Sequence, residues 1–569
     1  MKRPRRRLER RLTIALVVSA IGATFAPSSA SAGGLFLTDR GTRQLGRGFA
    51  WVAGADDPGA LWYNPAGLAW SGQQFLLEAT TTFLRADFTR VDSGGNTLAT
   101  VDANAQPLPI PMMGYSHPFG DFTLGVGAFA PNASLLRWPR GVTSDGARCD
   151  TPGAGDCGAA PQRYSLYSLE GSAFVNVSAA LAWRPHPSFA VGLGALLMVG
   201  SFTGETATSA CDGFVCTQPE SPREDGSARF ELPVIQPGVS LGVTYASDFV
   251  RVGASATWWP GALRGTAKLN VRLPGSPLYD DARLEGDEAS LQLDLPVMVR
   301  AGVEVRPIRT LRIEAAFVYE SWSMQEQATI RPDNVWIRGA TGIGDYQLGD
   351  IIIPRNMKDV FSVRLGGSLD ILDDRVTLSA GVNYENSSFD DSYLQPLTLD
   401  SDKLVVGLGA SIRVHRNVFI DVSYGHIFLR NREVTNSRVP QPNPIRPPRS
   451  TDVPPTAGGQ VYVGNGSYRM EADMFGLGIR WSPQPDTPPA SDEPDVTDDA
   501  TDEDSGAPEQ SETLVLDAPS SEAEPAPLET ETTQEGEPGD SDGDGVNDAR
   551  DQCEDSPAGA AVDWLGCPV

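Results

Sequence analysis

Strict alternation between apolar and polar residues, repeated many times along the chain, constrains the fold of this sequence more than any other feature. From Leu169 to Trp183 the odd positions are apolar or glycine, whereas the even positions include Glu170, Asn176 and Ser178. Residues 378–385 alternate in the same way. Because successive side chains of a β-strand point to opposite faces, this period of two predicts strands with one apolar and one polar face.

The connections between these strands alternate between short and long. Short turns lie at 117–121, 184–188, 246–248, 306–310, 372–375 and 414–417, and long polar connections lie near 131–163, 204–226, 260–287, 324–355 and 431–466. A β-sandwich has no reason to keep this parity, whereas outer-membrane barrels combine tight periplasmic turns with long outer loops. The sequence therefore predicts an all-β fold, a 14-stranded antiparallel transmembrane β-barrel within residues 71–482. The predicted strands cover 73–88, 108–117, 121–130, 164–184, 188–203, 228–246, 249–259, 288–306, 310–323, 356–371, 375–388, 402–414, 417–431 and 467–481.

The chain begins with a predicted signal peptide, residues 1–32. Basic residues between Lys2 and Arg11 precede an apolar run, and Ala30-Ser31-Ala32 has the small residues that a signal peptidase accepts. Paired arginines also fit twin-arginine export, but a barrel crosses the inner membrane unfolded, which favours the general secretory route. We therefore expect an outer-membrane protein of a Gram-negative bacterium, with both termini on the periplasmic side.

The negative charge of the chain is concentrated in its C-terminal tail. The formal net charge is −28, and residues 483–540 contain 19 acidic side chains and no basic one. Such a segment buries too little apolar surface to fold, so residues 483–539 are predicted to be a disordered acidic linker. The acidic balance, without a compensating basic stripe, excludes a nucleic-acid-binding function.

Residues 540–569 carry regularly spaced oxygen ligands. The carboxylates that suit Ca²⁺ are those of Asp540, Asp542, Asp544, Asp548 and Asp551, with glycines between them that permit sharp turns. Together with Cys553 and Cys567, the segment resembles one thrombospondin type 3 calcium repeat. Calcium is therefore the predicted cofactor, no organic cofactor is expected, and a plain acidic linker is the alternative. We interpret the repeat as a spacer or docking element for a periplasmic partner.

The six cysteines form three pairs that are close in sequence. They are Cys149 with Cys157, Cys211 with Cys216, and Cys553 with Cys567. In an exported protein such pairs predict local disulfides on loops and on the tail. A metal site is less favoured, because the chain has four histidines and none lies near a cysteine.

Residues 33–70 precede the first strand and show no strong periodicity. They contain Leu45-Gly46-Arg47-Gly48-Phe49-Ala50, then Ala55-Asp56-Asp57-Pro58, and finally Trp62-Tyr63-Asn64-Pro65-Ala66-Gly67-Leu68. In this order and with nearly this spacing, the three elements resemble the hatch of the FadL-type outer-membrane transporters of long-chain fatty acids, a family that includes aromatic-hydrocarbon relatives. The resemblance covers about residues 33–482.

The resemblance implies that residues 33–70 fill the barrel lumen as a plug. In that family, outer loops capture a hydrophobic ligand, which passes to a site at the N-terminal residues and leaves sideways at a kink in the third strand. The hatch tip, Leu35 and Phe36, is the expected ligand contact, and Asn64, Pro65 and Ala66 are expected to shape the hatch. Here the third strand meets Pro131-Asn132, where proline interrupts strand pairing. The alternative is that the strand simply ends there.

Passive uptake of long-chain fatty acids or similar hydrophobic compounds is the predicted function. An apolar groove lowers the barrier that water imposes on such molecules, each buried CH₂ contributing ~0.8 kcal/mol. A ligand carboxylate would need a luminal cation, for which Arg163 and Arg300 are candidates. Uptake of aromatic or other hydrocarbons, or a structural role in the cell envelope with a closed hatch, are the alternatives.

The expected partners of the protein are its hydrophobic cargo, outer-membrane lipids and the barrel-assembly machinery. The four histidines are scattered, at positions 117, 186, 415 and 426, and no nucleophile–histidine–acid constellation can be assembled around them. No enzyme activity is therefore expected.

Overall fold

The computed structural model describes residues 39–104, 108–130, 137–149, 156–169, 172–209, 220–261, 263–372, 374–443 and 461–483. All of them belong to one compact unit that comprises residues 1–489. Within these described ranges, no helix is both long and apolar enough to cross a membrane.

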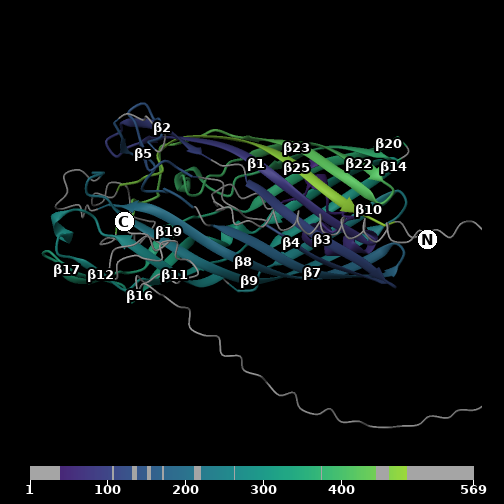
Figure 1. Cartoon of the computed structure of the whole chain (residues 1–569), viewed down its shortest axis with the longest axis horizontal. Helices are drawn as coiled ribbons and strands as arrows, with labels where there is room; N and C mark the ends of the chain where they lie inside the picture. Colours follow the sequence, from purple (N-terminus) through teal and green to yellow (C-terminus); the bar gives the residue numbers. More distant parts are fainter. Residues whose placement is uncertain are drawn as a thin grey trace, which may run out of the picture. The chain divides into compact units, whose positions relative to one another are not determined.

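Fourteen antiparallel strands close into a barrel (Figure 1). In order around the barrel they are β1 (Gln74–Val91), β3 (Leu108–Phe119), β4 (Phe122–Phe129), β7 (Ala173–His186), β8 (Phe189–Thr208), β9 (Gly226–Ala246), β10 (Val250–Trp258), β14 (Met298–Ile308), β15 (Leu311–Glu320), β20 (Val360–Ile371), β21 (Val376–Glu385), β22 (Lys403–His415), β23 (Val418–Leu429) and β25 (Gly466–Trp481). The last strand, β25, closes the barrel by pairing with β1. The predicted 14-stranded barrel is confirmed.

Side chains along each strand alternate between the lumen and the outer surface. On β25 the outward residues Phe475, Leu477, Ile479 and Trp481 are exposed and apolar, whereas the inward Met474 is buried. A belt of exposed apolar side chains around a closed barrel is stable in lipid and not in water. The apolar positions of the alternating strands therefore form a surface that faces lipid.

Two of the predicted strands extend too far. The barrel strand predicted at 164–184 begins at Ala173, and the one predicted at 288–306 begins at Met298. Residues 161–165 form turns instead, with the Leu166 N–H donating to Gln162 O (3.1 Å). In the second case the alternating residues before Pro296 belong to a separate strand, because proline cannot donate a ladder hydrogen bond.

Shorter strands extend the wall beyond the barrel at the end that carries the long connections (Figure 1). β11 (Leu263–Arg272), β13 (Glu288–Leu293), β16 (Gln327–Asp333) and β19 (Ile351–Pro354) pair in this order, and β11 also pairs with β9. β2 (Thr97–Asn104) pairs with β1, and β24 (Arg432–Val434) pairs with β25.

Small sheets and short 3-10 helices complete the long connections. One sheet consists of β5 (Gly141–Val142) and β6 (Gly158–Ala159), and another of β12 (Arg283–Glu285), β17 (Trp336–Ala340) and β18 (Gly344–Gln347). The 3-10 helices are η2 (Pro277–Tyr279), η3 (Trp322–Met324) and η4 (Asp391–Tyr393).

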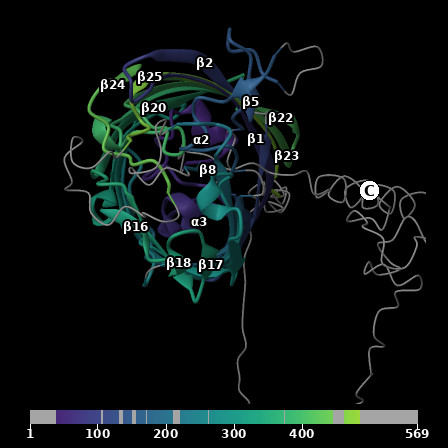
Figure 2. The ribbon, with the colours of Figure 1, turned by 90° about the vertical axis from the view of Figure 1, so that its left-hand side faces the viewer.

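The described residues that precede β1, 39–71, lie inside the barrel (Figure 2). They form α2 (Thr42–Gly46), α3 (Ala60–Tyr63) and the 3-10 helix η1 (Pro65–Trp70), and Figure 2 shows α2 and α3 surrounded by the strands. Almost all residues from Asp39 to Ser71 are buried. We call residues 39–71 the luminal segment.

Candidate functional site

Asn64 fixes the luminal segment to the barrel wall. Its side-chain amide donates to Val52 O (3.0 Å) and to Thr244 Oγ1 on β9 (2.9 Å), and its Oδ1 accepts from Ala66 N (3.2 Å). Pro65 opens η1, where its fixed φ suits the start of a helix. In the structure, Asn64, Pro65 and Ala66 anchor the segment and do not line the apolar cavity described below.

Glu314 on β15 holds the turn that follows α2. Its carboxylate accepts hydrogen bonds from three successive backbone N–H groups, those of Val52 (2.6 Å), Ala53 (2.9 Å) and Gly54 (3.0 Å). Arg47 of the luminal segment lies between this carboxylate (3.2 Å) and that of Glu304 (2.9 Å). The three charged side chains are buried. This cluster ties the luminal segment to the wall by both charge and backbone contacts.

Further ion pairs fill the lumen near the short turns. Asp56 lies 3.1 Å from Arg43 and 2.8 Å from Arg312, which follows the turn between β14 and β15. Asp57 lies 2.8 Å from Arg43. An apolar molecule moving down the barrel axis would have to pass these charged side chains, of which Asp57 is buried and Arg43, Asp56 and Arg312 are 13–20% exposed. The luminal segment and its ion pairs therefore oppose this route for an apolar molecule.

Glycines in the wall give the luminal segment the room that it needs. A Cβ at Gly381 on β21 would lie 2.2 Å from the carbonyl carbon of Arg47, and one at Gly407 on β22 would lie 1.9 Å from Leu45 O. Both distances are much shorter than van der Waals contact. Only glycine allows the two backbones to approach this closely.

We expect Gly381→Val to displace the luminal segment without unfolding the barrel. The new side chain would meet the backbone of Arg47, whereas valine itself suits a strand. Limited proteolysis of the purified protein should then cleave within residues 39–71, where the wild type resists. Gly349→Val is the matched control, because nothing lies within 4 Å of a Cβ there. Equal resistance of the two variants would contradict the close approach.

An apolar cavity lies in the half of the protein that carries the long connections. Its volume is about 240 Å³. Barrel strands and outer strands both contribute to its apolar wall, which includes Phe174, Met198, Phe202, Phe230, Leu291 and Ile330. Phe202 and Phe230 contact each other, with ring centroids 5.4 Å apart. A wall of this kind binds the apolar body of a small molecule.

Cationic side chains also line the cavity, namely Arg40, Arg355 and Lys403. Lys403 is compensated by Glu385 (2.9 Å) and Asp400 (3.2 Å). Arg355, between β19 and β20, donates to Gln325 Oε1 (3.1 Å), and no described carboxylate lies within ion-pair distance of it. Burial lowers the pKa of the Arg355 guanidinium to about 10, so it stays charged at neutral pH. The cavity thus combines an apolar wall, the three carboxylates of Glu320, Glu385 and Asp400, and one cation that lacks a described carboxylate partner.

Arg40 connects the cavity to the end of the third barrel strand. It lines the cavity, and its Nε donates to Ala130 O (3.4 Å), directly after the last residue of β4. Burial lowers the pKa of this guanidinium to about 10. Trp62 packs edge-on against Phe129, with ring centroids 5.3 Å apart. The described ladders from β4 to both of its neighbours end at Phe129, so Arg40 spans from the cavity to the end of the described part of β4.

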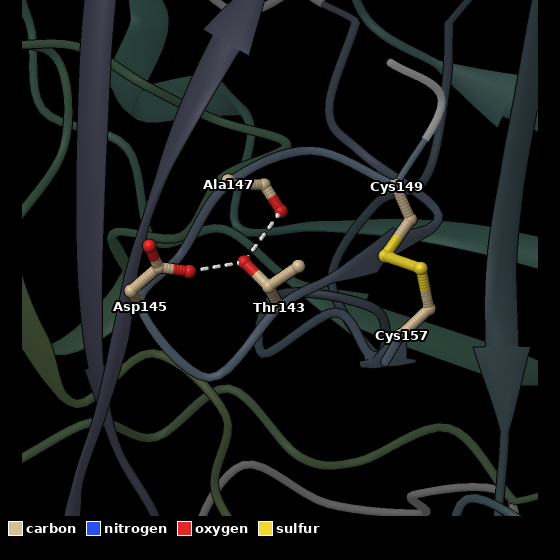
Figure 3. Close-up of a disulfide and its surroundings, with 5 residues drawn as sticks. All are labelled: Thr143, Asp145, Ala147, Cys149 and Cys157. Carbon is tan, nitrogen blue, oxygen red and sulfur yellow. Dashed lines mark hydrogen bonds between the residues drawn. A yellow bond between two sulfur atoms is a disulfide. The ribbon is translucent and has the colours of Figure 1, made fainter. Parts of the chain in front are cut away.

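Many predicted site residues lie outside the part of the chain that the structure describes. They are Leu35 and Phe36, Pro131 and Asn132, the calcium ligands Asp540, Asp542, Asp544, Asp548 and Asp551, and the cysteines Cys211, Cys216, Cys553 and Cys567. These stay predictions. Cys149 and Cys157 form a disulfide on the connection between β5 and β6 (Figure 3).

Neither of the two arginines suggested for a ligand carboxylate lines the cavity. Arg163 pairs with Asp225 (2.6 Å), and Arg300 lies against Trp62, with its guanidinium carbon 4.9 Å from the ring centroid. Sequence reasoning missed Arg355 because it ends a long predicted connection. The available signal was a basic residue directly after the apolar run Ile351–Pro354.

The sequence and the fold both match known proteins. The family model described as outer membrane protein transport protein (OMPP1/FadL/TodX) matches residues 172–463. A FadL homologue of Pseudomonas aeruginosa is similar in structure, with a TM-score of 0.59 and 15% identity over 80% of this chain and 100% of that chain. The toluene transporter TodX of Pseudomonas putida has a TM-score of 0.51 and 15% identity, over 78% and 98% of the two chains. The toluene transporter TbuX of Ralstonia pickettii has a TM-score of 0.50 and 16% identity, over 78% and 99%.

No curated protein matches the sequence significantly. At these identities the solved structures show a shared fold, and the family model supplies the sequence relationship over more than half of the chain. A closed barrel of fourteen strands with an internal N-terminal segment agrees with both findings. The chain is therefore an outer-membrane β-barrel that belongs to the outer membrane protein transport protein (OMPP1/FadL/TodX) family.

Proposed function

We propose that this protein takes up hydrophobic molecules that carry a carboxylate, of the long-chain fatty-acid class, across the outer membrane. The observation that carries the proposal is the Arg355 guanidinium in a largely apolar cavity. Leaving a partly buried charge in apolar surroundings without a counter-charge is costly, and a carboxylate would relieve that cost through charge-assisted hydrogen bonds. The acyl chain would pack against the apolar wall, each CH₂ contributing ~0.8 kcal/mol.

The route that we propose leaves the cavity beside Arg40 and passes through the wall at the end of β4. Two observations support it. The ion pairs of Arg43, Asp56 and Arg312 place charged groups in the lumen, and Arg40 reaches from the cavity to Ala130 O. A lateral exit would deliver the acyl chain into lipid without returning it to water, and it requires no energy source.

A neutral aromatic hydrocarbon is the second candidate cargo. Phe202, Phe230 and Trp322 present aromatic rings to the cavity, and two of the similar solved structures are described as toluene transporters. Such a cargo would use the apolar wall and leave the charge of Arg355 without a partner. The two candidates therefore differ in whether a carboxylate improves binding.

Competition between dodecanoate, dodecanol and toluene for the purified protein tests the proposal. Each compound displaces a neutral apolar fluorescent dye, and the first two share one acyl chain. We expect dodecanoate to bind about tenfold or more tightly than dodecanol, since hydrogen bonds to charged groups contribute roughly 1.5–3 kcal/mol. Equal binding of the two, with displacement by toluene, would assign the hydrocarbon class. Displacement by none of the three would overturn both candidates.

A further inference from the structure

Four adjacent strands of the wall stop at one level. The ladders of β10, β14, β15 and β20 end in a row of residues that are in register across the strands, namely Thr257, Met298, Glu320 and Val360. Beyond this row the chain resumes pairing as β11, β13, β16 and β19, which we call the outer sheet. Four irregular crossings therefore separate the outer sheet from these barrel strands, while β9, which pairs with both β10 and β11, keeps the wall one sheet.

The four segments that join the barrel strands to the outer sheet adopt turn conformations or contain proline. Gly261 (φ 76°) and Asn356 (φ 38°) lie in the left-handed region, and η3 forms a 3-10 turn in a third crossing. Pro260 and Pro296 supply no N–H for a ladder. A continuous sheet resists bending along its strands, whereas a row of such turns lets the outer sheet move relative to the barrel strands.

The outer sheet has one attached edge and one free edge. At the attached edge, β11 pairs with β9 from Lys268↔Glu231 to Arg272↔Ser227. At the opposite edge β19 pairs with β16, and the described residues provide no ladder partner on its other side. A sheet held in this way swings about β9.

The inner face of the outer sheet forms part of the wall of the apolar cavity. Its inward residues Leu291, Leu293, Ala328, Ile330 and Ile353 line the cavity. Its outward side chains are polar and exposed, as at Glu288, Ser290 and Gln327. Movement of this sheet would therefore uncover apolar surface that is otherwise shielded from water.

An exposed ion pair holds the corner where β19, at the unpaired edge of the outer sheet, continues through residues 355–359 into β20. Lys358, in the crossing between β19 and β20, places its Nζ 2.7 Å from Asp390 Oδ2, and its backbone N–H donates to Ser388 O (2.7 Å). The two charged side chains are 59% and 44% exposed, so water and salt weaken their attraction. Breaking this ion pair therefore costs little free energy.

We propose that the outer sheet is a lid that swings on its β9 edge and opens at its β19 edge, admitting apolar molecules to the cavity. Lys358 and Asp390 hold the free corner in the closed state. The proposal rests on the cavity being the ligand site of the proposed function, and it holds for either class of cargo. Because the lid carries much of the apolar wall, its opening would control how fast a ligand binds. It would have less effect on which ligand is bound.

Fastening the corner covalently tests the lid. In the Lys358→Cys/Asp390→Cys variant, a short bis-methanethiosulfonate reagent would link the two thiols, and the association rate of a neutral apolar dye with the purified full-length protein is measured. We expect the link to slow association by about tenfold or more, because the open state is no longer populated, and dithiothreitol to restore it. The control is Thr89→Cys/Thr100→Cys on β1 and β2, where the hydroxyls lie 2.7 Å apart.

Unchanged dye association in the linked corner variant would overturn the lid. A second measurement needs no ligand, so that failure of the lid and failure of the proposed function are distinguishable. Spin labels at Ser290→Cys on the outer sheet and Thr100→Cys on β2 report their separation by pulsed electron resonance, and the protein without introduced cysteines gives the background. We expect a second, longer separation that gains population in Lys358→Ala. One unchanged separation in both proteins would reject the motion.

Discussion

Replacing Glu314 by alanine releases the luminal segment and makes the barrel permeable to ions. The substitution leaves three buried N–H groups, those of Val52, Ala53 and Gly54, without their acceptor and removes one of the two counter-charges of Arg47. Hydrogen bonds to a charged group contribute roughly 1.5–3 kcal/mol each, so losing even two of them raises the population of the displaced segment about 100-fold or more. Single-channel conductance in planar bilayers measures this population directly.

A matched control separates release of the segment from general damage to the barrel. Glu471→Ala removes a glutamate from the outer surface of β25, where it pairs with the exposed Arg85. Its conductance should equal that of the wild type, because exposed pairs contribute about 0–1 kcal/mol. Glu314→Gln keeps an acceptor for the N–H groups and should lie between wild type and Glu314→Ala. If Glu314→Ala stays as tight as the wild type, the three hydrogen bonds are not what closes the lumen.

The barrel could be predicted from the sequence because its determinants are local. The alternation of apolar and polar residues predicts which face of the sheet each side chain occupies. The alternation of short and long connections predicts that the strands form a barrel. The errors arose where alternation continued past the end of a ladder. Residues before Pro296 alternate as a strand should, and they do pair, but in β13 of the outer sheet and not in the barrel.

The contacts that form the site could not be predicted because they join residues far apart in the chain. Glu314 meets Val52 across 262 positions, and nothing near either residue signals the other. The sequence makes Arg163 a candidate for a ligand carboxylate, but the fold places Asp225, 62 positions away in the chain, beside it. Arg355 is the better candidate because the fold places it at an apolar cavity wall and brings no described carboxylate within ion-pair distance. Which carboxylate neutralises a given arginine is decided by the fold. It cannot be predicted from a single sequence.

Arg355→Gln should separate the two classes of cargo. Glutamine keeps a polar side chain at the crossing between β19 and β20 but cannot supply a positive charge, so only a ligand with a carboxylate loses a partner. We expect dodecanoate affinity to fall about 10- to 150-fold, the equivalent of roughly 1.5–3 kcal/mol, while dodecanol affinity stays within about twofold. Displacement of the neutral dye measures both ligands on one protein.

The position of Arg355 at the edge of the lid makes the choice of controls important. Arg355→Lys keeps the charge without the planar fork, so it should restore part of the dodecanoate affinity. Arg331→Gln removes an exposed arginine that pairs with Asp350 on the outer sheet and should leave both affinities unchanged. A loss of dodecanol binding as large as that of dodecanoate would mean that Arg355 supports the cavity structurally. A selective loss of dodecanoate, rescued by lysine, would instead identify this guanidinium as the group that receives the carboxylate.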